Sequence, residues 1–147
     1  MLPENVKTAA DALKIVEERK ISHIKVGLFD MDGVLRGKYM SKAKFTSALE
    51  GGFGFCDVVL GWDSNDQLYD NITFTGWHTA FPDAPVRVLP TTCREIPFEE
   101  ETLLFLAEFS GCVCNIVFGI GVSRAQRTRQ QRDCAKQYVS FHSGVFC

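Results

Sequence analysis

The most constraining feature of this sequence is a strand, a tight turn and a second strand that follow one another between residues 24 and 40. Apolar side chains alternate with other residues over Ile24–Leu28, which is the period of a strand with one buried face. The pair Asp32-Gly33 is a favoured turn sequence, so the stretch that begins at Val34 can return antiparallel to the first strand. The sequence therefore predicts a β-hairpin.

Three helices are predicted around this hairpin. Apolar residues recur at helical spacing over Val6–Val16, with polar residues on the other side. Ser41 is a favourable N-cap for a helix over Lys42–Glu50, and two glycines after it supply the stop. A third helix is predicted over Pro97–Phe109, because three consecutive glutamates would place negative charge in its first turn.

The stretch between residues 53 and 90 is aromatic and rich in Gly and Asp, which is typical of a loop-bearing edge of a sheet. Short strands are predicted there at Val58–Leu60, Ile72–Thr75 and Val86–Leu89, between turn signals. Together with the hairpin and the helices, these strands indicate an α+β fold.

The charge of the chain divides at Phe109. Residues 1–109 hold 11 Lys and Arg against 17 Asp and Glu, whereas residues 110–147 hold 5 against 1. Four of the 6 cysteines also lie in the second part. A length of 147 residues with 46% hydrophobic residues suits one folded domain. No apolar run could span a membrane and no signal peptide is evident, so we expect a cytoplasmic chain with reduced thiols.

The strand that leads into the turn carries one enzymatic pattern. Residues 26–35 resemble the first motif of the haloacid-dehalogenase-like phosphatases, in which Asp30 would attack phosphorus and Asp32 would protonate the leaving group. Residues 110–147 offer only Asp133 toward the late acidic pair of that family. A hairpin turn with exposed carboxylates accounts for the same residues, so the phosphatase is an alternative hypothesis.

A second resemblance covers more of the chain. Fragments in the same order as in the N-terminal β-grasp domain of the glutamine synthetase family, type I-like branch, are residues 32–38, 52–55, 61–63, 75–77, 82–84, Arg87 and 97–99. The resemblance implies a β-grasp domain in residues 21–109, which the N-terminal helix in residues 1–20 precedes. Residues 110–147 are predicted to be a divergent, irregular, basic and Cys-rich tail, because the charge reverses and the family pattern is lost there.

The resemblance implies an ATP-dependent ligase that joins glutamate to ammonia or a larger amine, with Mg²⁺ or Mn²⁺ ions held by a catalytic domain. It places a carboxylate of the N-terminal domain near the ammonium site, where it could hold NH₄⁺ and assist its deprotonation. The matching residue is Asp63, or with a shifted alignment Asp66 or Asp57. A turn aspartate that accepts bonds from its own backbone is the plain alternative.

The family pattern is not recognisable after Ser110, and the metal-binding glutamates and ATP-facing basic residues of the family are missing from this sequence. We therefore expect no cofactor or metal in this chain, no catalysis by it alone, and a product of truncation, splicing or a frame shift. Docking to full-length subunits, which form rings in the family, is the alternative role.

Other residues are assigned plain roles. We interpret Trp62 and Trp77 as packing residues. Arg36 and Lys38 are interpreted as a solvated hairpin edge, with contact to phosphate or to an adjoining subunit as the alternative. In the tail, the spacing of Cys112, Cys114, Cys134 and His142 fits no common zinc pattern. The arginines of residues 124–132 could bind nucleic acid through their charge, but a solvated segment is the expected structure. We therefore expect neither a nucleic acid nor a membrane as a partner.

Overall fold

The computed structural model of this chain describes residues 1–110, and the expectations for the cysteines, His142 and arginines of the tail lie outside them. Met1–Phe109 form one compact unit. In chain order its elements are η1 (Pro3–Asn5), α1 (Ala9–Glu18), β1 (His23–Phe29), β2 (Leu35–Ser41), α2 (Lys42–Gly51), β3 (Phe53–Cys56), η2 (Asp57–Leu60), β4 (Asp83–Ile96) and β5 (Glu99–Phe109).

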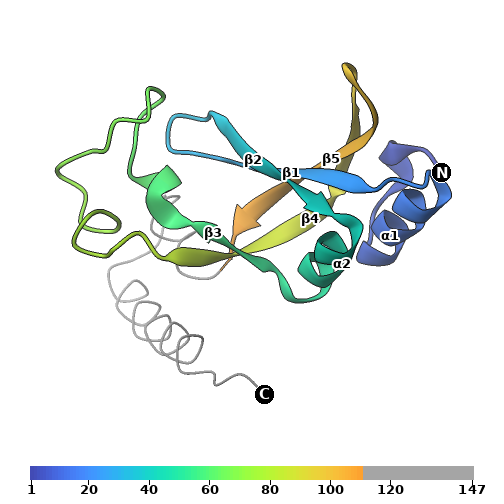
Figure 1. Cartoon of the computed structure of the whole chain (residues 1–147), viewed down its shortest axis with the longest axis horizontal. Coiled ribbons are helices and arrows are strands. Elements are labelled where there is room, and N and C mark those ends of the chain that lie inside the picture. The colour runs from blue at the N-terminus through green and yellow to red at the C-terminus, as the bar shows by residue number, and fades with distance from the viewer. Residues whose placement is uncertain (111–147) are drawn as a thin grey trace, which may run out of the picture. The chain divides into compact units, whose positions relative to one another are not determined.

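The five strands form one mixed sheet in the order β2-β1-β5-β4-β3 (Figure 1). β1 pairs antiparallel with β2 and parallel with β5, so the first and last strands lie side by side in the interior of the sheet. β4 is antiparallel to both β5 and β3. The α+β class and the predicted hairpin are confirmed.

The hairpin turn is closed by three residues between Asp30 and Val34. The N–H of Asp30 donates to the carbonyl of Val34 at 3.0 Å, and the N–H of Gly33 donates to the carbonyl of Asp30 at 3.2 Å. Gly33 has a φ of +79°, the left-handed conformation that three-residue hairpin loops require at this position. The turn therefore starts at Asp30, two residues before the predicted Asp-Gly pair.

Both flanking helices are confirmed, with small changes at their ends. Ser41 caps α2 by accepting a bond from the N–H of Lys44 at 3.3 Å. α1 begins later than the periodicity indicated, because Thr8 and Asp11 form a capping box at its N-terminus. The chain before that cap makes the short helix η1, which packs against β4.

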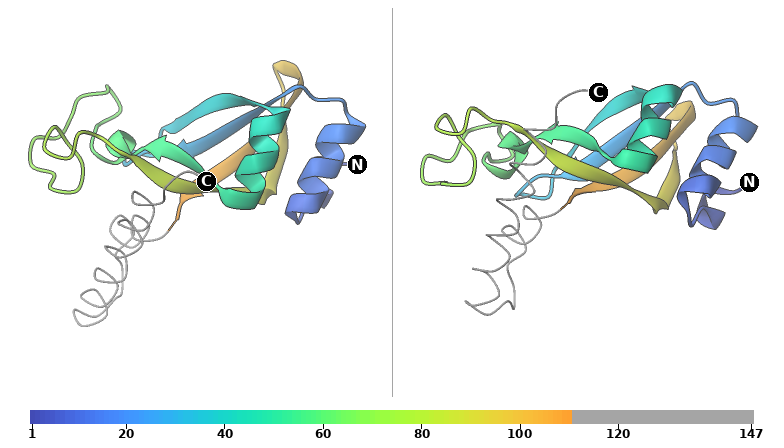
Figure 2. Two further views of the ribbon diagram at one scale, coloured as in Figure 1. Left: turned by 60° about the horizontal axis from the view of Figure 1, so that its bottom comes forward. Right: turned by 90° about the horizontal axis from the view of Figure 1, so that it is seen from below.

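The core lies between α2 and one face of the sheet (Figure 2). Phe45 of α2 is fully buried against Phe105 of β5, with ring centroids 4.8 Å apart. Ile24 and Val26 of β1 are in register with Leu103 and Phe105 and are buried on the same face. Because this face comes from strands far apart in sequence, the core forms only when β1 and β5 pair.

Three predictions about local structure are wrong. Residues 99–109 are the strand β5 and not a helix, since its buried residues alternate and its backbone pairs with two neighbouring strands. Val58–Leu60 lies in the 3-10 helix η2, and Ile72–Thr75 forms bends without strand pairing. The apolar run of β5 resembled a helix because a strand in the interior of a sheet also has apolar residues on its second face.

The two edge strands of the sheet approach each other through Lys38. Its Nζ lies 5.1 Å from the ring centroid of Phe53 and 5.2 Å from that of Phe55, both in β3. It also donates to the carbonyl of Gly54 at 3.4 Å. The sheet is therefore strongly curled, which brings the hairpin near the segment that follows β3.

No helix within residues 1–110 is long and apolar enough to cross a membrane.

Candidate functional site

The candidate site lies where the hairpin turn meets the segment between η2 and β4. This segment, residues 61–82, extends from the end of the sheet opposite the N-terminus (Figure 1). Its first part, residues 61–69, folds back on itself, because the N–H of Tyr69 donates to the carbonyl of Gly61 at 2.9 Å and Trp62 pairs with Leu68. We call residues 61–69 the acidic loop, since it contains Asp63 and Asp66.

Asp30 organises the hairpin turn from inside. Its side chain is fully buried, with Oδ1 accepting from the N–H groups of Asp32 at 3.0 Å and Val34 at 2.8 Å. Its Oδ2 accepts from Nε of Arg36 at 2.8 Å. Burial alone would raise the pKa of Asp30, but the bonds from Arg36 and the two backbone groups outweigh it and lower this pKa. The expectation of an exposed carboxylate at this position is wrong.

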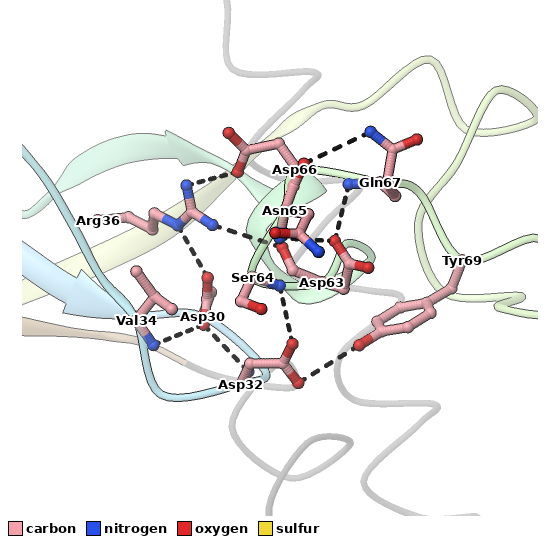
Figure 3. A network of polar contacts seen from close by, with 10 residues as sticks. All are labelled: Asp30, Asp32, Val34, Arg36, Asp63, Ser64, Asn65, Asp66, Gln67 and Tyr69. Atoms are coloured by element: carbon pink, nitrogen blue, oxygen red, sulfur yellow. Dashed lines mark hydrogen bonds and ion pairs between the residues drawn. The ribbon is translucent and has the colours of Figure 1, made fainter.

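Asp32 connects the turn to the acidic loop. Its Oδ2 accepts from the N–H of Ser64 at 2.8 Å, and its Oδ1 accepts from the hydroxyl of Tyr69 at 3.4 Å (Figure 3). Burial, and next the negative charge of Asp32, raise the pKa of Tyr69. Asp32 therefore accepts two bonds across the gap between hairpin and loop, at a site that favours a neutral tyrosine.

Arg36 is the cation among these carboxylates. Besides Asp30, its NH1 pairs with Oδ1 of Asp66 at 2.6 Å, and its NH2 donates to the carbonyl of Asp63 at 3.5 Å. The guanidinium lies 5.1 Å from the ring of Trp62. Bonding to Asp30 raises the pKa of Arg36, so it stays charged. With a side chain only 20% exposed, Arg36 is not the solvated edge residue that the sequence suggested.

Asp63 is half-buried and oriented by its own loop. Its Oδ1 accepts from the N–H groups of Asn65 at 2.8 Å and Gln67 at 2.9 Å. Its backbone N–H donates to the carbonyl of Gln67 at 2.9 Å, which closes the loop beneath the carboxylate. Within residues 1–110 its Oδ2 has no hydrogen-bond partner. Asp63 thus has the local role of a turn aspartate and keeps one oxygen for another group.

The two alternative aspartates are differently placed. Asp66 is exposed, has a φ of +62° and uses one oxygen in the ion pair with Arg36. Asp57 is only 4% exposed and accepts from the hydroxyl of Thr75 at 2.6 Å. Burial raises the pKa of Asp57, and the nearby charge of Asp83 adds to this. Among the three candidates, Asp63 is the half-buried carboxylate that two backbone N–H groups orient.

Asp57 leads to a prediction about stability. A raised pKa in the folded state means that Asp57 favours folding below the ordinary pKa of an aspartate, and that this contribution is lost as pH rises through the folded-state value. We expect Asp57→Asn to raise the free energy of unfolding at pH 7 by about 0.5–1 kcal/mol, the usual size of one stabilising substitution. Urea unfolding at pH 7 and pH 3 measures this. A stabilisation at pH 3 as large as that at pH 7 would contradict burial of the charge as its cause.

The side chains of this site limit the chemistry that it can support. Within residues 1–110 no group of three or more His, Cys, Asp or Glu residues could hold a metal ion. The pair Asp30 and Asp32 accepts hydrogen bonds inside the turn and across to the loop. The remaining chemistry is that of a negatively charged surface with an oriented carboxylate, which favours a small cation.

The two tryptophans have unequal positions. Trp62 lies under the guanidinium of Arg36, as a packing residue does, although its buried Nε1 finds no hydrogen-bond partner within residues 1–110. Trp77 is 84% exposed and contacts the ring of Phe81 edge-on, with centroids 5.2 Å apart. The packing predicted for Trp77 is therefore limited to this contact with Phe81, and most of its side chain is exposed.

Sequence reasoning missed Arg36 and Tyr69 as parts of this site. The hairpin register contains a signal for Arg36, because it pairs with Leu28 and so lies on the buried face of the sheet. A basic residue on such a face requires an acidic partner. No comparable signal exists for Tyr69, whose bond to Asp32 joins residues 37 positions apart.

Comparison with known proteins shows which proteins this chain is similar to. No family model matches the chain. It is 48% identical over 100 residues to type-1 glutamine synthetase 2 of Dictyostelium discoideum, covering 66% of this chain and 19% of that protein. It is 32% identical over 109 residues to glutamate–isopropylamine ligase of a Pseudomonas species, covering 74% and 24% respectively. The cryo-EM structure of Plasmodium falciparum glutamine synthetase superposes with a TM-score of 0.52 at 12% identity, covering 97% of this chain and 24% of that one.

The five-stranded α+β fold and these similarities define the N-terminal domain of a class of ligases. The chain belongs to the glutamine synthetase family, as the sequence resemblance predicted. It spans about a fifth to a quarter of the length of these relatives.

Proposed function

We propose that residues 21–109 act as the β-grasp domain of a glutamine synthetase-type ligase and present Asp63 to the ammonium or amine substrate. The observation that carries this proposal is the carboxylate of Asp63, oriented by two backbone N–H groups with its second oxygen unpaired within residues 1–110. An oriented carboxylate attracts an ammonium ion and can accept a proton as the amine becomes nucleophilic. Two relatives named as a glutamine synthetase and a glutamate–isopropylamine ligase support this class of substrate.

The Mg²⁺ or Mn²⁺ ions expected of the family do not fit the described residues. No group within residues 1–110 offers three metal-ligating side chains, so no step of the reaction is assigned to them. The aligned region is 19% and 24% of the two relatives. We propose that residues 1–109 are inactive alone and contribute to ligation only together with a catalytic domain.

A chimera tests the role of Asp63. Residues 1–109 would replace the similar segment of the Dictyostelium enzyme, and the purified chimera would be assayed with ammonium and with isopropylamine. We expect Asp63→Asn to raise the KM for ammonium roughly tenfold to a hundredfold, the size expected when a charge-assisted contact is lost. The KM for ATP and for glutamate should change less than about twofold, because Asp63 contacts neither in this proposal.

Asp70→Asn is the matched control, since Asp70 is an exposed aspartate of the same segment. An unchanged ammonium KM in Asp63→Asn, with an active chimera, would contradict the proposed role. The 147-residue chain assayed without a catalytic domain should release no phosphate from ATP in the presence of glutamate and ammonium.

A specific observation favours docking as a second role. On the sheet face opposite α2, the apolar side chains of Phe29, Leu35 and Tyr39 are exposed. Exposed apolar surface of this kind is typical of interaction sites. Co-purification of the tagged chain with the Dictyostelium enzyme, weakened by Leu35→Glu, would support docking. Equal recovery of the enzyme with both chains would contradict this face as the docking site.

A further inference from the structure

Arg36 uses all three nitrogens of its guanidinium, one within the hairpin and two toward the acidic loop. Nε bonds Asp30 within the turn, NH1 pairs with Asp66 and NH2 reaches the carbonyl of Asp63 (Figure 3). Trp62 provides an aromatic surface 5.1 Å away. A lysine ammonium at this position could not make these separate contacts, since it is a single point charge on a flexible stem.

We infer that Arg36 is a positioning residue for Asp63: it holds the acidic loop against the hairpin and so presents the Asp63 carboxylate in one orientation. The role assigned to Asp63 rests on the proposed function. The contact between hairpin and loop rests on the geometry alone.

The contacts divide between those within the loop and those that fix its position. Asp63 still binds the N–H groups of Asn65 and Gln67 when Arg36 is absent, so the loop keeps its internal turn. Apart from Arg36, the bonds of Asp32 to Ser64 and Tyr69 are the side-chain hydrogen bonds that join the loop to the hairpin. Loss of the guanidinium should therefore let the acidic loop move relative to the hairpin while the turn inside the loop is kept.

Asp66 supports this assignment by its backbone conformation. Its φ of +62° lies in the left-handed region, which costs free energy for a residue other than glycine. The conformation is held on one side by the N–H of Asp66, which donates to the carbonyl of Asp63 at 3.1 Å, and on the other by the ion pair with Arg36. The ion pair with Arg36 therefore helps to hold Asp66 in its strained conformation.

The sheet does not depend on this side chain. Arg36 lies on the edge strand β2, whose backbone pairing with β1 runs from His23–Ser41 to Phe29–Leu35. The buried contact of Phe45 with Phe105 lies elsewhere in the core. A change at Arg36 is therefore expected to be local.

Hydrogen exchange of the full 147-residue chain tests the inference. Arg36→Met keeps much of the aliphatic length and removes the charge and the donors. We expect amide exchange in residues 61–69 to accelerate at least about tenfold and exchange in residues 103–109 to stay unchanged. Arg87→Met is the matched control, because Arg87 of β4 forms its ion pair with Glu108 of β5 and not with the acidic loop. It should leave residues 61–69 unchanged.

Two further variants keep the test decisive. Arg36→Lys retains the charge and should restore only part of the protection. Asp66→Asn removes the loop side of the ion pair and leaves Asp30 with Arg36, so it should reproduce the loop-specific acceleration even if Arg36→Met folds poorly. Unchanged exchange in residues 61–69 of both Arg36→Met and Asp66→Asn, or an equal increase across the sheet, would overturn the inference.

Trp62 fluorescence provides a readout at the contact itself. The chain has 2 tryptophans, so Trp77→Phe leaves Trp62 as the single emitter. In that background Arg36→Met should change the emission of Trp62, whereas Arg87→Met should not. Identical emission with and without the guanidinium would count against the contact between Arg36 and Trp62.

The chimera separates this inference from the proposed function. Arg36→Met should raise the ammonium KM, and the double variant with Asp63→Asn should be no worse than Asp63→Asn alone, because Arg36 acts through Asp63. Additive effects on the ammonium KM would overturn positioning through Asp63. If Asp63→Asn leaves this KM unchanged while Arg36→Met still accelerates loop exchange, the proposed function fails and Arg36 retains only its hold on the loop.

Discussion

Phe105→Ala is expected to remove about 3–5 kcal/mol from the free energy of unfolding. Phe105 is 0% exposed, lies on β5 between β1 and β4, and packs its ring 4.8 Å from that of Phe45. Truncation would leave a cavity between α2 and the sheet that neither rigid element can close. Domains of this size have about 5–15 kcal/mol of stability, so most of it could be lost.

Phe98→Ala is the control for this prediction. Phe98 is the same residue type seven positions earlier, but it is 95% exposed. Its truncation should change the stability by less than about 0.5 kcal/mol. Urea unfolding followed by circular dichroism compares the two variants with the wild type. Similar midpoints for Phe105→Ala and Phe98→Ala would contradict the assignment of the core to this face of the sheet.

Asp30→Ala is expected to cost roughly 2–3 kcal/mol. The substitution leaves the N–H groups of Asp32 and Val34 without their acceptor and the guanidinium of Arg36 without one of its two carboxylates. Asp70→Ala removes an exposed aspartate and should have little effect. Equal effects of these two substitutions on the urea midpoint would contradict a structural role for Asp30.

The pKa of Asp30 adds a pH dependence with a definite sign. Because this pKa is lower in the folded state, the contribution of Asp30 is present above the ordinary aspartate pKa of about 3.9 and is lost as pH falls through the folded-state value. The wild type should therefore lose stability below about pH 4 more steeply than Asp30→Ala. Parallel pH profiles would contradict the ion pair with Arg36 as the cause.

The phosphatase hypothesis can be tested with the same proteins. In that hypothesis Asp30 attacks phosphorus, whereas in the structure both of its oxygens accept hydrogen bonds and its side chain is fully buried. Phosphate release from an aryl phosphate with Mg²⁺, present in the wild type and absent in a folded Asp30→Asn chain, would support the phosphatase. The proposed function does not require this phosphatase activity.

The candidate site was predictable only in part. The resemblance led to Asp63, or with a shifted alignment to Asp66 or Asp57, but it could not give the exposure of these carboxylates, because their exposure depends on residues far along the chain. Asp57 is buried and accepts a bond from Thr75, 18 positions after it, and Asp66 is paired with Arg36, 30 positions before it. Such long-range contacts leave no local periodicity in a sequence.

What the sequence by itself determined is the hairpin and its two flanking helices, because turn and cap chemistry act over a few residues. Gly33 adopts the required left-handed conformation, and Ser41 caps α2 as predicted. Only the tertiary structure decided that Glu99–Phe109 is a strand, since its hydrogen-bond partners lie in β1 and β4. The same is true of Arg36, whose carboxylate partners gather around it only when the curled sheet brings the hairpin against the acidic loop.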